Sequence, residues 1–189
     1  MASSNNSSSA LVTLPRRKND YDVFVTFRGE DTRFNFTDHL FAALQRKGIF
    51  AFRDDTKLQK GESIAPELFH AIQASQVFIV VFSNNYASST WCLRDLEKIL
   101  ECSHLYGKRV LPVLYDVDPS EVRKQSGNYE KAFAEHEETF KHDSQMVQRW
   151  REALTQVANL SGWICVISEQ SSLLVSYILI LLILQILKL

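Results

Sequence analysis

The chain has 189 residues, of which 46% are hydrophobic and 23% are charged, and its formal net charge is -1. This length and composition are typical of one globular domain with a sizeable core. The near-neutral charge excludes an overall bias toward nucleic acid or anionic membranes. The three cysteines form no CxxC pair and no metal-ligand spacing with the five histidines, so we expect reduced cytosolic thiols and no metal site.

The N-terminal stretch is rich in serine and asparagine (MASSNNSSSA) and lacks the apolar segment of a secretory signal. We expect residues 1–19 to form a disordered leader. Its acid-poor composition, followed by Arg16, Arg17 and Lys18, also faintly resembles a plastid transit peptide. Composition favours the solvated leader over the transit peptide.

The next segment alternates short apolar strands with an amphipathic helix. Tyr21–Phe27 (YDVFVTF) predicts a strand, and it is followed by a polar, glycine-containing loop that carries Arg28 and Arg33. An apolar stripe with a 3.6-residue period predicts a helix from about Phe34 to Lys47. A second, short strand is expected at Ile49–Arg53.

The middle of the chain holds the segment around which the interpretation is organised. After a charged loop, Asp54–Ser63, and a predicted helix, Ile64–Ser75, comes the run Val77–Phe82 (VFIVVF), which is apolar throughout. Such a run is typical of a parallel strand buried on both faces. Turn residues and hydroxyl side chains suited to an N-cap follow it, and they predict a helix from near Trp91 to about Tyr106.

Two residues at the start of that helix indicate a binding site. Trp91 and Asp95 are four positions apart, so they share one face of the helix. They follow a buried strand, which is where open α/β sheets bind ligands. The alternative is that Trp91 is a core residue and that Asp95 is a first-turn acid favoured by the helix dipole.

The rest of the expected domain continues the same alternation. Arg109–Leu114 predicts a strand, and its Pro112 indicates an edge position because proline cannot donate to a ladder. Turn chemistry predicts a loop over Tyr115–Gly127, and helices are expected at Tyr129–His142 and Ser144–Leu160. Strands that alternate with helices of this length predict a flavodoxin-like α/β fold, a doubly wound sheet of parallel strands flanked by helices.

That fold brings separate polar segments together. The loop with Arg28 and Arg33, the Asp54–Ser63 loop and the start of the Trp91 helix each follow the carboxyl end of a strand. In a parallel sheet these ends lie along one edge. Cations, an aromatic ring and carboxylates therefore converge there, as a nucleotide-sized polar ligand would require.

The C-terminal stretch, residues 164–189, is different in kind, since Leu173–Leu187 is apolar except for Ser176, Tyr177 and Gln185. A bilayer crossing takes roughly 20 residues, and this run is shorter. Three accounts remain open: a transmembrane helix that anchors the protein, an apolar extension folded against the domain, and a chance sequence that arose by truncation of a longer reading frame. A long apolar run is unfavourable in water, so membrane association remains open as well.

Taken together, residues 20–163 resemble the plant Toll/interleukin receptor (TIR) domains of nucleotide-binding, leucine-rich-repeat immune receptors. The resemblance rests on several motifs in order: YDVFVTFRGEDTR (21–33), GIFAFRDD with LQKGESI (48–64), SNNYASSTWCLRDLEKI (83–99), VLPVLYDVDPSEVRKQSGNY (110–129) and RWREAL with NLSGW (149–163). Because they occur in the family's order, the combination is far more specific than any single motif. The form would be a TIR-only or truncated one.

The resemblance implies an NAD+ hydrolase that acts in plant immune signal transduction after self-association. The catalytic carboxylate would be Asp95, at a position where the family usually has glutamate. The family's substrate-binding and self-association positions match these residues: Arg28, Arg33, Asp54, Asp55, Ile64, Ser89 and Trp91 for NAD+, and Asp38 and His39 for self-association. NAD+ would be the substrate, and no cofactor is expected.

The shorter stem of Asp95 predicts weak activity, because a misplacement of roughly 1 Å can cost on the order of a hundredfold in rate. The alternative function is a catalytically poor adaptor or decoy that binds other TIR receptors. The expected partners are NAD+ and other TIR domains, with no specific nucleic acid and with a membrane only through the tail. The expected location is the cytoplasm, with association to a membrane through the tail left open.

Overall fold

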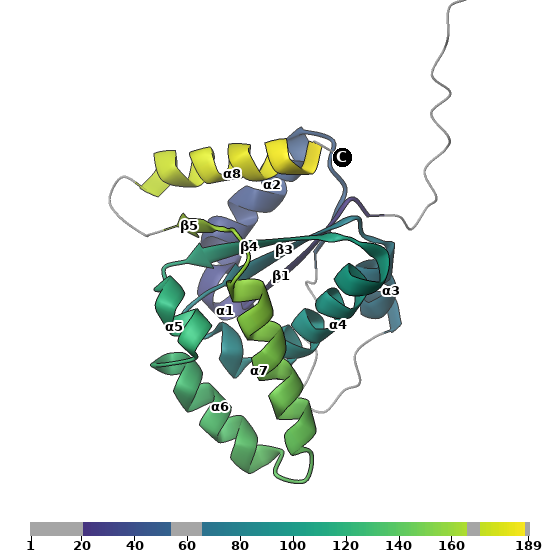
Figure 1. The fold of residues 1–189 in the computed structure, drawn as a ribbon. Coiled ribbons are helices and arrows are strands. Elements are labelled where there is room, and N and C mark those ends of the chain that lie inside the picture. The colour runs from purple at the N-terminus through teal and green to yellow at the C-terminus, as the bar shows by residue number, and fades with distance from the viewer. Residues whose placement is uncertain (1–20, 54–65, 166–170, 188–189) are drawn as a thin grey trace, which may run out of the picture.

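The computed structural model describes residues 21–53, 66–165 and 171–187. Within these residues one sheet of five strands has the order β2-β1-β3-β4-β5, and every neighbouring pair is parallel. The strands are β1 (Val23–Phe27), β2 (Ala51–Arg53), β3 (Val77–Phe82), β4 (Arg109–Tyr115) and β5 (Trp163–Cys165). The predicted doubly wound parallel sheet is therefore confirmed (Figure 1).

The helices that belong to this sheet are α1 (Gly29–Thr32), α2 (Asp38–Arg46), α3 (Pro66–Ala74), α4 (Thr90–Tyr106), α5 (Pro119–Lys124), α6 (Asn128–Thr139), α7 (Ser144–Ala158) and α8 (Ser171–Leu187). Successive side chains of a strand point to opposite faces of the sheet, so each face presents apolar residues that helices cover. The helices therefore form two layers, one on each face. Phe24, Phe78 and Val80 pack in one core with α3 to α7, whereas Val23, Val25 and Ile79 pack in the other with α2 and α8. Figure 1 shows these layers on the two sides of the sheet.

Strand β3 lies at the centre of the sheet and has the bounds that its sequence predicts. All six of its residues are buried, because β1 and β4 flank it and helices cover both faces. An unbroken apolar run suits this position, since neither face meets water. The carboxyl end of β3 is consequently a fixed point for the segment that leads into α4.

Strand β4 corrects one prediction. Pro112 indicated an edge strand, yet β4 pairs with β3 on one side and with β5 on the other. The pairing with β5 begins at Val113, one residue after the proline. The chain passes close by at Gly162, where an added Cβ would stand 2.5 Å from the carbonyl oxygen of Pro112. The proline is tolerated because it precedes the part of β4 that pairs with β5.

The segment after β1 also differs from the prediction. The expected loop between Arg28 and Arg33 is the short helix α1, and Arg33–Thr37 forms a wide π-helical turn before α2. This extra width changes which side chain faces the sheet. Phe34, expected on the apolar stripe, is 86% exposed, and Phe36 is buried in its place.

Two short elements were missed. The predicted loop from Tyr115 to Gly127 contains α5, which Asp118 caps by accepting a hydrogen bond from the backbone amide of Ser120 at 2.6 Å. Strand β5 was not predicted because it is only three residues long and one-sided. Short elements of this kind depend on neighbours that are distant in sequence, and the local pattern does not carry that information.

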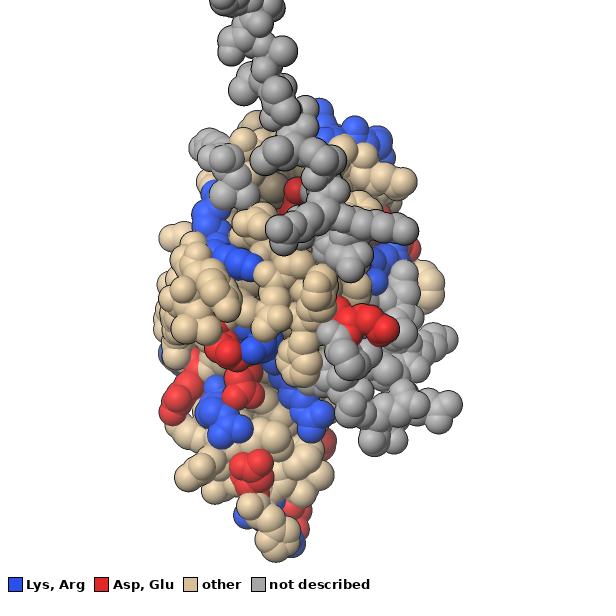
Figure 2. Space-filling view, turned by 90° about the vertical axis from the view of Figure 1, so that its right-hand side faces the viewer, with Lys and Arg blue, Asp and Glu red and all other residues tan. Residues whose placement is uncertain are grey.

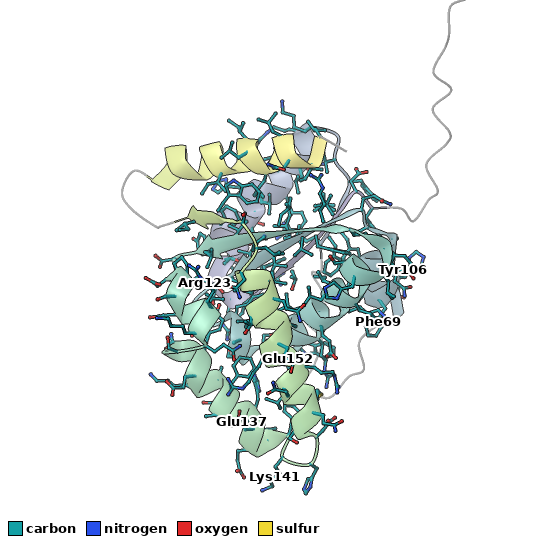
Figure 3. All side chains as sticks on the ribbon, in the orientation of Figure 1. Phe69, Tyr106, Arg123, Glu137, Lys141 and Glu152 are labelled. Carbon is teal, nitrogen blue, oxygen red and sulfur yellow. The ribbon has the colours of Figure 1, made fainter. Side chains whose placement is uncertain are left out.

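Helix α7 is joined to its neighbours by charged side chains. Arg149 pairs with Glu97 of α4 (Nε to Oε1, 2.6 Å), and Arg151 pairs with Glu137 of α6 (Nη2 to Oε1, 2.7 Å). Figure 3 shows Glu137 and Lys141 at the end of the molecule that lies farthest from the sheet. These pairs orient the α6–α7 hairpin, while the buried indole of Trp150 packs against His136 and Phe140.

The apolar tail forms α8, which lies over the sheet beside α2 (Figure 1). Ile178, Leu182 and Ile186 are buried, in the same core as Val77 of β3. The guanidinium of Arg109 donates a hydrogen bond to the carbonyl of Gln185 at 2.6 Å. This arrangement corresponds to the account in which the extension folds against the domain. Among the described residues, no helix combines the length and apolarity that a bilayer crossing needs.

Candidate active site at the carboxyl edge of the sheet

The segment between β3 and α4 positions the two residues singled out at the helix start. After β3 the chain makes a 3-10 turn, Tyr86–Ser88, and then enters α4 with Ser89 as N-cap. The hydroxyl of Ser89 accepts a hydrogen bond from the backbone amide of Cys92 at 3.3 Å. Ser89 therefore fixes the start of α4, six residues ahead of Asp95.

Asp95 lies on the buried side of α4 and is 7% exposed. Its Oδ2 accepts a hydrogen bond from Thr26 Oγ1 of β1 at 3.4 Å. The hydroxyl of Thr26 also lies 3.2 Å from that of Tyr86, and the single Tyr86 proton has a second acceptor within reach, the carbonyl of Cys92 at 3.1 Å. A hydrogen bond thus joins the Asp95 side chain to Thr26 near the end of β1, two residues before Arg28.

Trp91 is half-buried, one helical turn before Asp95. The guanidinium carbon of Arg94 lies 5.6 Å from the centroid of its ring system, a cation–π distance. Sequence reasoning missed this contact, although a spacing of three along a helix indicates it. A substrate ring that stacks on Trp91 would use surface that Arg94 leaves open, or it would displace Arg94.

Arg28 is held by two acids of α1. It forms an ion pair with Glu30 and a second with Asp31, whose Oδ1 lies 2.7 Å from Nη1. Asp31 also accepts hydrogen bonds from the Ser83 hydroxyl at 2.6 Å and from the backbone amide of Asn85 at 3.1 Å. Asp31 therefore joins the segment after β1 to the segment after β3.

The pKa of Asp31 reflects these contacts. Burial raises the pKa of its carboxyl group, but the hydrogen bonds from Ser83 and Asn85 and the charge of Arg28 outweigh burial, so the pKa lies below its ordinary value of 3.8. A carboxylate with several donors is stabilised in its charged form. Asp31 was not singled out from the sequence, although its place between Arg28 and Arg33 in the segment RGEDTR was a usable signal.

Arg33 folds back onto the end of β1. Its guanidinium carbon lies 5.8 Å from the ring centroid of Phe27, and a Cβ added at Gly29 would stand 2.8 Å from its Nη2. Any residue larger than glycine at position 29 would therefore displace the Arg33 side chain. Both predicted arginines lie at the carboxyl edge of the sheet. Arg28 forms ion pairs with two acidic side chains, and Arg33 contacts an aromatic ring.

The remaining predicted site residues divide into two groups. Asp54, Asp55 and Ile64 lie outside the described residues. Asp38 opens α2 and pairs with Arg53 at the end of β2 (Oδ1 to Nη2, 2.6 Å), while His39 beside it is exposed. The pair therefore lies at the carboxyl end of β2.

Cys92 is the nearest thiol to Asp95, and its environment keeps it protonated. Burial raises the pKa of Cys92 to about 12, and the charge of Asp95 contributes in the same direction. Its Sγ donates a weak hydrogen bond to the carbonyl of Phe27 at 3.5 Å. The group is thus a packing residue and not a nucleophile. Searched over the described ranges, His, Cys, Asp and Glu side chains form no group of three that could hold a metal ion.

The charge is also mixed on another face of the molecule, the one that lies to the right in Figure 1. In Figure 2, the acidic and basic side chains of the described residues are interspersed over the face shown. This distribution agrees with the net charge of -1 and gives that face no marked preference for a polyanion.

Comparison with known proteins identifies the family. The model of the family described as TIR domain matches residues 20–180. Disease resistance protein RPV1 of Vitis rotundifolia is 56% identical over 157 residues, which are 83% of this chain and 11% of that protein. TMV resistance protein N of Nicotiana glutinosa is 54% identical over 142 residues, 75% of this chain and 12% of that protein. The chain thus spans about a tenth of the length of these relatives.

A solved structure agrees with the sequence matches. The TIR domains in the structure of an activated Roq1 resistosome, which recognises the pathogen effector XopQ, are 50% identical to this chain. The superposition has a TM-score of 0.75 and covers 88% of this chain and 99% of the other. With the family match over most of its length, the chain belongs to the TIR domain family, in its plant disease-resistance branch.

Proposed function

We propose that this domain is an NAD+ hydrolase that acts in plant immune signalling and that becomes active when copies associate. The observation that carries the proposal is the Asp95 carboxyl group, held by Thr26 at the carboxyl edge of the sheet, one helical turn from the half-buried indole of Trp91. Membership in the TIR family and the likeness to the TIR domains of an assembled resistosome support it.

The chemistry suits a sheltered carboxylate. Hydrolysis breaks the bond between nicotinamide and the ribose, water supplies the new hydroxyl group, and nicotinamide leaves as a neutral base with release of one proton. The transition state resembles an oxocarbenium ion, and a nearby carboxylate stabilises its positive charge most where water is excluded. Asp95 meets that condition with 7% exposure, although its stem is one methylene shorter than that of glutamate.

The proposal is tested by nicotinamide release from protein crowded on a bead surface, so that local concentration is high. We expect slow release from the wild-type protein, faster release from Asp95→Glu and none above background from Asp95→Ala. Glu97→Gln is the matched control, because Glu97 lies on the same helix but pairs with Arg149 of α7. Equal release from wild type and Asp95→Ala would remove the role assigned to Asp95.

A second candidate function, a catalytically poor adaptor or decoy that binds other TIR domains, is favoured by one observation. Arg28 is engaged by Glu30 and Asp31, so a substrate phosphate would have to compete for it. Absence of nicotinamide release at every surface density, together with binding of a second TIR domain that is weakened by a change at Asp38 or His39, would support the adaptor and contradict the hydrolase.

For location, we propose the cytoplasm, where a domain with reduced thiols would have access to NAD+. Among the described cysteines, Cys92 and Cys102 are buried and free. Fractionation of the expressed full chain tests this proposal. Recovery in the membrane pellet at high salt would contradict it.

A further inference from the structure

We propose that Thr26 and Tyr86 position Asp95 for catalysis, as a pair of buried hydroxyl groups that supplies the carboxylate with a fixed hydrogen-bond donor. This inference rests on the proposed hydrolase function, since it concerns the same carboxyl group. It assigns roles to two residues that do not themselves touch the substrate, one on β1 and one in the turn before α4.

The three side chains come from separate segments and meet in the interior. Thr26 is 2% exposed, Tyr86 is fully buried, and Asp95 is 7% exposed. Thr26 Oγ1 lies 3.4 Å from Asp95 Oδ2 and 3.2 Å from the Tyr86 hydroxyl. Thr26 is also the one polar residue of β1, and its hydroxyl group is the part of this strand that bonds to Asp95 of α4.

The number of protons decides how the pair works. Each hydroxyl group has one proton to donate and lone pairs to accept. If Tyr86 donates to Thr26, the Thr26 proton is left for Asp95. The other acceptor of Tyr86, the carbonyl of Cys92, lies inside α4, where the helix itself supplies a backbone donor. Tyr86 can therefore serve Thr26 without leaving a buried carbonyl group unsatisfied.

The environment keeps both hydroxyl groups as donors. Burial, and next the nearby Cys92, raise the pKa of Tyr86 well above its ordinary value, so the phenol stays protonated. Among the groups described around it, Tyr86 from the turn and Cys92 from its own helix interact electrostatically with Asp95, and both are neutral at physiological pH. A neutral donor thus orients the carboxylate without neutralising the negative charge that the reaction needs.

The size of the effect follows from the loss of one buried hydrogen bond to a charged group. Thr26→Val keeps the shape of the side chain and removes the hydroxyl, so we expect the kcat of nicotinamide release to fall roughly 10- to 100-fold. KM should change little, because the hydroxyl holds the carboxylate and does not bind NAD+. Thr26→Ser restores the donor and should restore kcat.

The control is a pair of buried threonines elsewhere in the domain. Thr37 donates to the hydroxyl of Thr32 at 2.7 Å in the turn before α2. Thr37→Val therefore removes a comparable hydroxyl without touching the carboxylate, and its kcat should match that of wild type. If Thr26→Val and Thr37→Val lose stability and activity in parallel, the role of Thr26 is only structural and the inference is overturned.

A second measurement keeps the inference testable without activity. In protein carrying 13C-labelled aspartate, the carboxyl resonance of Asp95 reports its titration directly. We expect its midpoint to rise in Thr26→Val and to return in Thr26→Ser, because removal of a donor destabilises the charged form. If wild type releases no nicotinamide but the midpoint shifts, the hydrolase proposal fails and the hydroxyl pair stands. An unshifted midpoint overturns the pair in either case.

Discussion

Asp31 links the two segments that carry the candidate site, and its removal makes the sharpest test of the fold at that edge. Its carboxylate accepts hydrogen bonds from Ser83 Oγ, the Asn85 amide and Arg28 Nη1, and its side chain is only 12% exposed. Asp31→Asn preserves size and one acceptor but removes the charge that Arg28 faces. The change therefore isolates the charged part of the contact.

The expected loss is about 2 kcal/mol, because a hydrogen bond to a charged group contributes about 1.5–3 kcal/mol and part of this site meets water. In a domain of this size the loss corresponds to a fall in Tm of roughly 4–8 °C at pH 7. Thermal unfolding followed by circular dichroism measures it. Glu30→Gln is the matched control, since Glu30 pairs with the same arginine but its side chain is 79% exposed, and its Tm should fall by no more than a third as much.

The stabilisation by Asp31 depends on pH, and the direction of its pKa shift gives the sign of that dependence. The folded pKa of Asp31 is lowered below the ordinary value of 3.8, so its contribution is fully present above pH 3.8 and is lost as pH falls through the folded pKa. The stability gap between wild type and Asp31→Asn should accordingly shrink below pH 3.8. A gap that stays constant down to acid unfolding, or one no larger than that of Glu30→Gln, would refute the reasoning.

Two further predictions concern the tail and the thiol. Leu182 of α8 is fully buried, whereas Leu184 is 51% exposed. In urea unfolding, Leu182→Ala should lower the free energy of unfolding by about 2–5 kcal/mol, and Leu184→Ala should change it by no more than about 0.5 kcal/mol. Equal effects of the two substitutions would contradict the packing of α8. Cys92 is buried, and its pKa is raised to about 12. It should therefore resist a thiol reagent such as dithionitrobenzoate in the folded protein at pH 8 and react in denaturant. Rapid modification of Cys92 in the native protein would contradict its burial.

The layered fold could be predicted because its main signals are local. The unbroken apolar run of β3 and the capped start of α4 are readable from neighbouring residues, and the structure has β3 at Val77–Phe82 and α4 from Thr90. The errors lie where partners distant in sequence decide. Pro112 suggested an edge strand because the sequence does not show that pairing with β5 begins only after the proline. Phe34 is not on the buried face because the π-helical turn at Arg33–Thr37 changes which side chains face the sheet.

In the candidate site, too, residues with local signals were predicted and partners distant in sequence were missed. Trp91 and Asp95 were found from their spacing and Arg28 from its place after a strand, because helix faces and strand ends follow from sequence position. The partners Thr26, Tyr86 and Asp31 were missed. Thr26 lies 69 residues from Asp95, and Asp31 lies 52 from Ser83, so only the folded sheet brings these pairs together. For Thr26, the visible sign was a single threonine in an apolar strand.

The contacts of Arg28 imply an order in which a negatively charged substrate would gain access to it. Glu30 is mostly exposed and bonds to Arg28 alone among the site's described polar contacts, whereas Asp31 is mostly buried and has donors from both Ser83 and Asn85. An exposed ion pair is worth little in water, so Glu30 is the partner that a phosphate can replace. Release of Asp31 would instead break the link between the segments that follow β1 and β3. Arg28 can thus turn toward a phosphate at the cost of Glu30 while Asp31 keeps the edge assembled.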